Sequence, residues 1–268
     1  MASGSDVQIN VDRACDYIAQ AAKQQAQLAV LPENFATMGL IPEQIRAHAE
    51  HFQTGKIQRQ LSAIAKQHKI WVVGGTLPLL GAPQDKIYSS CLVWDPKGEL
   101  TARYDKIHMF DVTVGSDDQY RESDLVCAGE KIITVDTPFA KLGLAVCYDI
   151  RFPELFRALM LKGVEIFILP SAFTIPTGQA HWEILLRARA IENLCYMVAS
   201  AEVGVRADGR GTYGHSMIID PWGKIQAQLH EEEGVILTTV EMDKVQKLRQ
   251  HFPVLTHYRS FVIKESVN

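Results

Sequence analysis

Three side chains that can take part in covalent chemistry come at the ends of apolar, strand-like stretches of the sequence: Glu33, Lys106 and Cys147. Taken singly, each has an ordinary structural interpretation, as a solvated acid, a surface lysine and a buried thiol, and base rates favour those interpretations. Ligands of layered α/β proteins gather outside the carboxyl ends of the strands. The shared position of the three residues therefore predicts that they meet in one site.

Together these residue types predict acyl transfer from a carbon–nitrogen bond. A neighbouring ammonium and a helix N-terminus lower the pKa of a thiol, which makes Cys147 the candidate nucleophile. A carboxylate such as Glu33 can take the thiol proton and later return a proton to the leaving amine. The ammonium of Lys106 and the backbone N–H of Tyr148 can stabilise the oxyanion of the tetrahedral intermediate.

The elements that must position these residues alternate between helices and strands early in the chain and form hairpins later. Apolar residues at helical spacing predict helices, and short apolar runs bounded by turn residues predict strands. We expect helices over 11–25, 56–68 and 180–194 and from Pro153 onward, and strands over 28–31, 70–73, 88–94, 100–107, 142–146, 164–169, 196–201, 216–220, 225–229 and 235–240. This order predicts a mixed α/β layered domain.

Composition argues against several classes of partner. The 268 residues carry 27 basic and 31 acidic side chains, a formal net charge of −4. Nucleic-acid-binding proteins usually present a basic face, so we expect no nucleic-acid partner. The first residues lack the basic and apolar regions of a signal peptide, and no apolar run approaches the ~20 residues that cross a bilayer. We therefore expect a cytoplasmic protein without a membrane partner.

Other patterns in the sequence suggest cofactor or metal chemistry but lack the context that it needs. The five cysteines are widely spaced without a Cys-x-x-Cys pair, so a disulfide framework or zinc knuckle is not indicated. Residues 209–214 match the glycine pattern of dinucleotide sites, but polar residues precede them and strand-like ones follow, which favours a flexible loop. His48 and His51 have no third ligand. The sequence predicts no metal and no cofactor.

Longer segments around the three residues resemble those of the nitrilase, or carbon–nitrogen hydrolase, superfamily, and the resemblance runs over nearly the whole chain. The segments are Leu-Pro-Glu-Asn at 31–34, Tyr-Asp-Lys-Ile-His at 104–108 and, the most specific, Cys-Tyr-Asp-Ile-Arg-Phe-Pro-Glu at 147–154. The resemblance implies a four-layer αββα sandwich formed by one carbon–nitrogen hydrolase domain over 1–268. It also implies a Cys-Glu-Lys triad and a homodimer or higher homo-oligomer, with helices and the tail 255–268 at the interface.

The resemblance further implies an assisting glutamate in the loop after the lysine. Glu122 stands at that place, within the polar stretch 111–130. A stretch of this length suggests a lid or an active-site loop. The alternative, that Glu122 is a solvated loop acid, stays open.

Two further segments resemble one branch of the family, the amidases that act on deaminated glutathione. They are Pro-Ser-Ala-Phe at 170–173 and Tyr-Gly-His-Ser-Met-Ile-Ile-Asp-Pro-Trp-Gly at 213–223. This implies hydrolysis of a small amide with an α-keto acid end, through a thioester. The alternatives are an ω-amidase acting on α-ketoglutaramate, a nitrilase, and a non-catalytic binding member of the same fold.

Three residues are candidates to line the substrate pocket: Arg151, His181 and Trp182. A cationic or imidazole side chain there could hold a substrate carboxylate. For Arg151 a structural role, in an ion pair with Glu154 or Asp149, is the favoured interpretation.

The start of the sequence departs from the family pattern. Family members usually begin with a strand that ends in a Gln-Met-like pair, ahead of the polar, serine-containing loop that here starts at Met1. We therefore expect the sandwich to lack its first strand, either because the numbered sequence starts late or because the sheet is one strand short.

Overall fold

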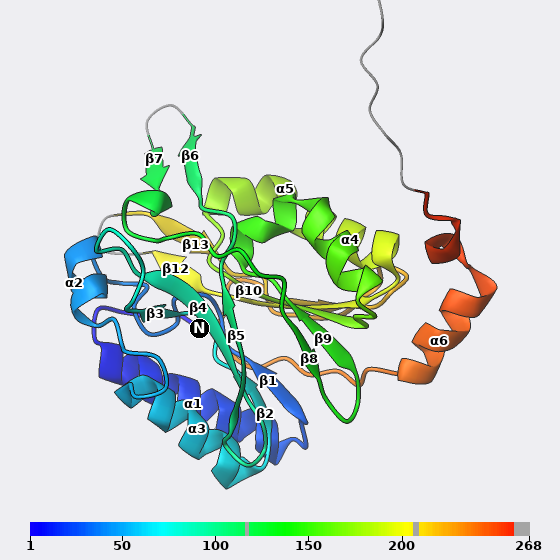
Figure 1. Ribbon diagram of the computed structural model, residues 1–268, viewed down its shortest axis with the longest axis horizontal. Coiled ribbons are helices and arrows are strands. Elements are labelled where there is room, and N and C mark those ends of the chain that lie inside the picture. The colour runs from blue at the N-terminus through cyan, green and yellow to red at the C-terminus, as the bar shows by residue number, and fades with distance from the viewer. Residues whose placement is uncertain (116–117, 206–208, 260–268) are drawn as a thin grey trace, which may run out of the picture.

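The computed structural model describes residues 1–115, 118–205 and 209–259, and two β-sheets lie at its centre (Figure 1). The first sheet comes from the first part of the chain. Its strands are β1 (Leu28–Val30), β2 (Trp71–Val73), β3 (Leu77–Leu79), β4 (Tyr88–Trp94) and β5 (Leu100–Asp105). β1 and β2 are parallel, and β4 pairs antiparallel with β2, β3 and β5.

The second sheet follows in sequence and has the order β15-β14-β11-β10-β9-β8. Its strands are β8 (Thr134–Asp136), β9 (Lys141–Leu144), β10 (Ile166–Ser171), β11 (Tyr196–Ala201), β14 (Met217–Ile219) and β15 (Ile225–Gln228). β9, β10 and β11 run parallel, β8 and β14 are antiparallel to them, and β15 pairs antiparallel with β14. Parallel neighbours bring their carboxyl ends to one edge of the sheet, where ligands bind in such folds.

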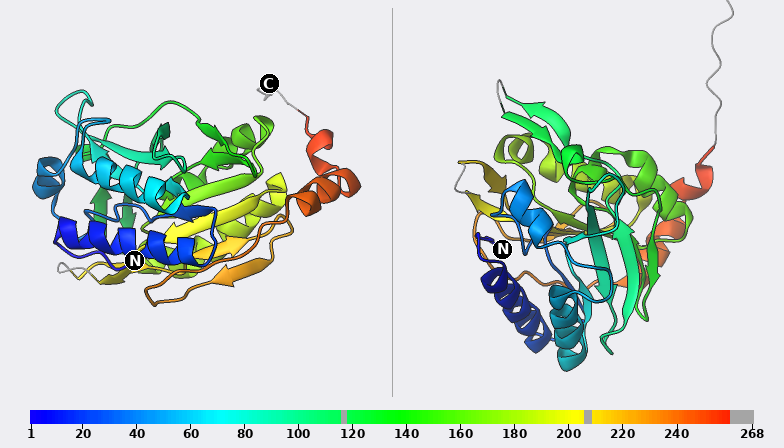
Figure 2. Two further views of the ribbon diagram at one scale, coloured as in Figure 1. Left: turned by 90° about the horizontal axis from the view of Figure 1, so that it is seen from below. Right: turned by 60° about the vertical axis from the view of Figure 1, so that its left-hand side comes forward.

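Helices cover the outer face of each sheet, as the views in Figures 1 and 2 show. Helices α1 (Val7–Lys23) and α3 (Lys56–His68) contact the first sheet, and α4 (Pro153–Leu161) and α5 (Ile175–Asn193) contact the second. The result is the four-layer αββα sandwich of the nitrilase type. The shorter helices α2 (Pro42–Ala47) and α6 (Met242–His251) lie outside these layers. Within the described ranges, no helix is long and apolar enough to cross a membrane.

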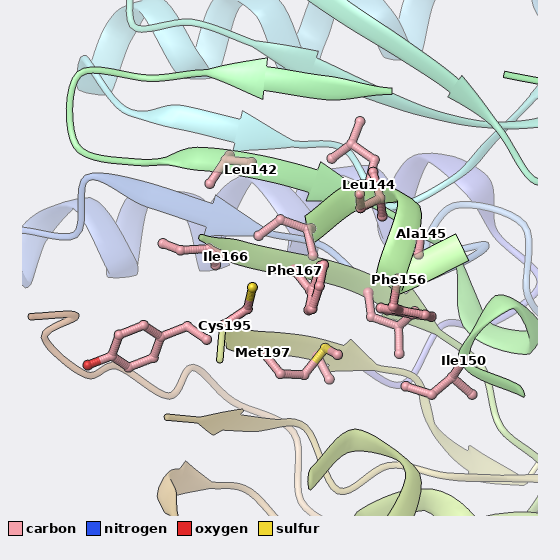
Figure 3. Packing of buried hydrophobic residues seen from close by; sticks show 14 of the residues in the cluster. Leu142, Leu144, Ala145, Ile150, Phe156, Ile166, Phe167, Cys195 and Met197 are labelled. Atoms are coloured by element: carbon pink, nitrogen blue, oxygen red, sulfur yellow. The ribbon is translucent and has the colours of Figure 1, made fainter. Parts of the chain in front are cut away.

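A hydrophobic core fills the space between the two sheets and continues beneath α4 and α5. It contains Val93 and Tyr104 from the first sheet, and Figure 3 shows its side chains around β9, β10 and β11. The rings of Phe156 on α4 and Phe167 on β10 meet edge to face, with centroids 5.1 Å apart. A second core cluster holds α1 and α3 against the first sheet. Burial of this apolar surface fixes the strand ends that carry the site.

Local sequence explains where the two longer outer helices begin. α1 starts after Asp6, whose side chain accepts a hydrogen bond from the Ile9 backbone N–H, as an N-cap does. α5 starts at Ile175, five residues before the predicted start at 180. Thr174 caps it by accepting from the Thr177 N–H, and proline at the second position suits the first turn of a helix.

Two further predictions about local structure are corrected. Residues 111–130 are not an irregular loop, because β6 (Asp111–Val114) pairs with β7 (Asp118–Arg121) and a 3₁₀ turn (Glu122–Asp124) follows. Part of the predicted flexible loop at 209–214 is β13 (Gly211–Tyr213), which pairs with β12 (Val203–Val205). In both hairpins, cross-strand backbone hydrogen bonds supply the order that the polar composition does not indicate.

The predicted strand over 235–240 is absent, because this stretch pairs with no strand of the described ranges. It lies opposite β1, which itself pairs on one side only, with β2. A groove of about 510 Å³, lined by Leu28–Pro32 and 234–240 among others, separates the two.

Candidate active site

Glu33 lies just beyond the carboxyl end of β1, and its side chain is buried. The loop that carries it is fixed at the next residue. Asn34 adopts a left-handed backbone conformation with φ of 54°, and its N–H donates to Thr76 Oγ1 at 2.9 Å. Asparagine tolerates this conformation better than most residues do. The turn therefore directs the Glu33 carboxylate inward.

Lys106 follows β5 directly and connects two carboxylates. Its Nζ donates to Glu33 Oε1 at 2.8 Å and to both Glu122 oxygens at 2.8 Å. Glu122 Oε2 also accepts from the Phe110 N–H at 2.6 Å. Only 2% of the Lys106 side chain and 18% of the Glu122 side chain are exposed. The structure therefore places Glu122 in the cluster with the lysine, and the solvated loop acid is not what is observed.

Cys147 lies three residues beyond the end of β9 and begins a 3₁₀ helix that ends at Arg151. Its φ of 46° is in the left-handed region, which costs a residue with a side chain on the order of 1–3 kcal/mol. Such strain is typical of sites where a side chain must be held in one direction. Tyr148 is the second residue of this helix, so the helix itself offers no partner for its N–H. The Cys147 side chain and the Tyr148 backbone N–H therefore come from adjacent residues just after β9.

Asp149 holds the lysine segment against the cysteine turn, and sequence reasoning missed it. One carboxylate oxygen accepts from Tyr104 Oη at 2.6 Å and from the Val146 N–H at 2.8 Å. The other accepts from the His108 N–H at 3.1 Å and lies 2.7 Å from His108 Nδ1. Tyr104 and His108 flank Lys106 by two residues on each side. That spacing was the available signal, because it places all three side chains on one face of an extended segment.

Burial and charge set the protonation states of the cluster. Burial raises the pKa of Cys147 well above its usual range, and the Glu33 carboxylate raises it further, while Lys106 and a hydrogen bond from the Ala172 backbone act the other way. The resting thiol is therefore protonated, contrary to the expectation of a lowered pKa. Burial alone would lower the pKa of Lys106, but Glu122 and Glu33 outweigh it and hold that pKa high. Burial also raises the pKa of Glu122, against the effect of Lys106.

A cavity of about 370 Å³ opens onto these groups. Its buried end is formed by Glu33, Lys106 and Cys147, and Tyr148 and Glu122 also line it. The other lining residues come largely from α2, from the two short hairpins and from the start of α5, and they include Phe110, Tyr120, Arg121, Phe173, Thr174, Thr177, Arg210 and Thr212. The cavity is large enough for a small organic molecule of the size that such pockets hold.

The three predicted lining candidates lie outside this cavity. Trp182 is buried, and its Nε1 donates to the His215 carbonyl at 2.8 Å. His181 is exposed, and its Nδ1 lies 3.3 Å from both terminal nitrogens of Arg151. The Arg151 guanidinium also stacks over the rings of Tyr148 and Phe173. Among the described ion pairs, none joins Arg151 to Glu154 or Asp149, so the structural role predicted for it takes a different form.

The sequence of this chain can be matched to a known protein family. A model of the carbon-nitrogen hydrolase family matches residues 1–250. The chain belongs to this family. It is accordingly a hydrolase of carbon–nitrogen bonds other than peptide bonds.

Named relatives and solved structures are similar over most of the carbon–nitrogen hydrolase chain. The deaminated glutathione amidase of Yersinia enterocolitica is 44% identical over 235 residues, which cover 87% of this chain and 82% of the relative. The human omega-amidase NIT2 is 35% identical over 253 residues, covering 94% and 90%. The crystal structure of Saccharomyces cerevisiae Nit3, a member of branch 10 of the nitrilase superfamily, superposes with a TM-score of 0.85 at 34% identity, covering 94% and 91%.

Proposed function

We propose that this hydrolase is a cysteine-dependent amidase that cleaves deaminated glutathione through a thioester acyl-enzyme. The observation that carries the proposal is the placement of Cys147, Glu33 and Lys106 together at the buried end of one cavity. The relative at 44% identity that bears the name deaminated glutathione amidase supports the choice of substrate.

The first half of the reaction forms the thioester. Because the thiol of Cys147 is protonated at rest, Glu33 acts as general base and takes its proton as the sulfur attacks the amide carbonyl carbon. The oxyanion that forms is stabilised by the Lys106 ammonium and the Tyr148 N–H. The carbon–nitrogen bond then breaks, and the protonated Glu33 gives its proton to the leaving amine.

The second half hydrolyses the thioester. Glu33 takes a proton from water, the resulting hydroxide adds to the carbonyl carbon, and the oxyanion again faces Lys106 and the Tyr148 N–H. The carbon–sulfur bond breaks, the carboxylic acid leaves, and the proton on Glu33 returns to the sulfur of Cys147. Glu122 assists by holding the lysine, since both of its oxygens accept from Nζ.

The test compares Cys147→Ala with a matched control, Cys127→Ala, a cysteine outside the cavity lining. Deaminated glutathione hydrolysis releases α-ketoglutarate and cysteinylglycine, which are measured separately. We expect Cys147→Ala to lower kcat/KM by about 10⁴-fold or more and Cys127→Ala to leave it unchanged. A substrate-dependent acyl adduct on Cys147 should appear by mass spectrometry in the wild type. Full turnover by the Cys147 variant would refute the proposal.

A second candidate is ω-amidase activity on α-ketoglutaramate, favoured by the likeness to human omega-amidase NIT2. The same residues would carry it, with ammonia as the leaving group. Measuring ammonia and cysteinylglycine release from the two substrates side by side separates the candidates. A nitrile tested beside its amide distinguishes a nitrilase, and no turnover of any of them would favour the non-catalytic binding member.

We further propose that the enzyme is a homodimer that meets through its second helical layer. Exposed apolar side chains gather there: Leu161 on α4, Ile184 and Ile191 on α5, and Trp222 beside Phe252, with ring centroids 5.5 Å apart. Apolar surface of this kind is typical of subunit interfaces. Light scattering should give twice the chain mass, and Ile184→Glu should give a monomer. Of the tail expected at the interface, residues 260–268 lie outside the described residues.

We also propose a cytoplasmic location, which the five free thiols fit.

A further inference from the structure

The open end of the cavity, which we call its mouth, has an apolar wall that the reaction described above does not use. Four side chains of one continuous segment form this wall: Met38, Leu40, Ile41 and Ile45. Ile41 is 57% exposed and the other three are half-buried, whereas Cys147 at the other end is 7% exposed. The wall therefore lies on the side from which a substrate enters the cavity.

The short helix α2, which lies outside the sandwich layers (Figure 1), orients this wall. Ile41 is its N-cap and Ile45 follows four residues later, so the two side chains share one face of the helix, and both line the cavity. The polar residues Glu43, Gln44 and Arg46 are exposed and outside the described lining. Because no residue of α2 is buried, core packing does not explain the two isoleucines. An apolar group that covered them would be bound favourably.

Apolar lining continues from α2 toward the reacting groups. It is formed by Pro78, Ile87, Leu125 and Val126, of which Ile87 and Val126 are buried. The Ile87 N–H donates to the Leu125 carbonyl at 3.0 Å, which joins the two parts of this inner lining. The cavity thus offers apolar surface both at its mouth and deeper inside.

The order of events on the enzyme indicates which half of the substrate meets the wall at the mouth. In the proposed reaction the amine leaves while the acyl group is still bound to Cys147, so the amine half needs an open route to solvent. Cys147 lies at the closed end of the cavity, and Ile41 lies at the open end. The acyl half thus stays at the buried end, and the amine half extends toward α2.

We propose that Ile41 and Ile45 determine specificity by contacting an apolar side chain on the amine half of the substrate. The proposal rests on the proposed amidase function. In deaminated glutathione the amine half is cysteinylglycine, whose CH₂SH group behaves as a small apolar side chain. In α-ketoglutaramate the amine half is ammonia, which has no side chain to contact the wall. The wall therefore favours amides whose amine carries an apolar side chain.

The experiment varies that side chain in four amides that share the acyl half of deaminated glutathione. Their amine halves are cysteinylglycine, 2-aminobutyrylglycine, serylglycine and glycylglycine, so the side chains are CH₂SH, CH₂CH₃, CH₂OH and hydrogen. Release of the dipeptide by the full-length enzyme gives kcat/KM for each amide. We expect similar values for the first two amides, about tenfold above those for the last two, because two apolar groups leave water on binding.

The double variant Ile41→Ala, Ile45→Ala should reduce this tenfold preference to about twofold or less. Because the preference is a ratio measured within one enzyme preparation, partial loss of folded protein does not change it. Ile9→Ala on α1 is the matched control, since Ile9 is 56% exposed but outside the described lining, and it should keep the preference. Ile45→Leu retains the apolar side chain and should keep the preference as well.

Equal wild-type kcat/KM for the 2-aminobutyryl and seryl amides would overturn the proposal, since no apolar contact would then be made. The wild-type preference in the double variant would also overturn it, because the contact would lie elsewhere. Failure of the wild type to hydrolyse any of the four amides or α-ketoglutaramate would instead refute the amidase function itself.

Discussion

The two ends of the cavity are built from different parts of the fold. The proposed reacting groups Glu33, Lys106 and Cys147 follow strands of the two large sheets, and none is more than 7% exposed. Other lining residues, among them Tyr120 and Thr212, lie on two-stranded hairpins outside the sandwich. The groups proposed for the chemistry thus lie where core packing fixes the backbone, and the outer lining lies where the chain can change with little cost to the core. Substitutions at the two ends should therefore differ in what they affect.

Buried carboxylates in two parts of the molecule are compensated differently. Glu33 and Glu122 share the Lys106 ammonium at the buried end. Glu202 lies at the start of the β12–β13 hairpin, where its carbonyl accepts from the Gly214 N–H. It is 1% exposed, and the described ion pairs contain no lysine or arginine partner for it. Its carboxylate accepts instead from the N–H and hydroxyl of Ser3. Buried negative charge is compensated by a lysine in one place, and by the N-terminal ammonium together with the donors of Ser3 in the other.

The largest effect should follow from removing the shared cation with Lys106→Met. The oxyanion loses its ammonium, so kcat/KM should fall by about 10³-fold or more. Glu33 and Glu122 are left as buried, uncompensated charges, so the free energy of unfolding at pH 7 should fall by about 3–5 kcal/mol. Steady-state kinetics and urea unfolding measure the two losses.

A second variant separates the two roles of the lysine. Adding Glu122→Gln to Lys106→Met removes one unpaired charge and should recover part of the stability without recovering activity. Lys66→Met on α3, an exposed lysine, should change neither quantity. If Lys106→Met had the same free energy of unfolding as the wild type, the ion pairs of Lys106 with Glu33 and Glu122 would not contribute to stability.

The buried end was largely predictable from the sequence and the mouth was not, for a physical reason. Polar residues that follow apolar strands stand out in the sequence, so Glu33, Lys106 and Cys147 could be chosen together from their shared position at strand ends. The role of Asp149 depends on contacts with residues 41 and 45 positions away, which no local pattern contains. The strands β6 and β7 have four residues each and only Val112, Val114 and Tyr120 as apolar side chains, so the alternation is too short to predict a strand. Arg121 and Arg210 meet in one cavity only through the tertiary fold.

A smaller effect on catalysis should follow from Asp149→Asn, which tests whether the buried end is held by its carboxylate scaffold. Each oxygen of Asp149 accepts from a backbone N–H, that of His108 or that of Val146, so an amide NH₂ at either position faces an N–H with which it cannot pair. The turn that carries Cys147 should shift against Lys106. We expect kcat to fall by about 10- to 100-fold, with a smaller change in KM, since misplacement by about 1 Å has this effect.

The control for this variant is Asp95→Asn, in the exposed turn between β4 and β5. There a single oxygen accepts from the N–H groups of Lys97 and Glu99, so the amide can keep both hydrogen bonds. Kinetics of the Asp95 variant should match the wild type. A normal kcat for Asp149→Asn would mean that core packing alone positions the cysteine turn.

The smallest effect on activity, and an opposite effect on stability, is expected for Glu202→Gln. Burial raises the pKa of Glu202 to about 7, although the N-terminal ammonium and the hydrogen bonds from Ser3 act the other way. Because the folded state holds the proton more tightly than the unfolded state, this carboxyl stabilises the fold below pH 4 and loses that contribution as pH rises through 7. The difference corresponds to about 3 kcal/mol at most. The wild type should therefore lose stability between pH 5 and pH 8, and the glutamine variant should lose less.

Thermal unfolding at pH 5 and at pH 8 measures this difference, and Glu231→Gln, a substitution at an exposed residue, is the control. Parallel pH profiles would show that Glu202 stays ionised, while a drop in kcat would show that the start of the hairpin is coupled to the buried end.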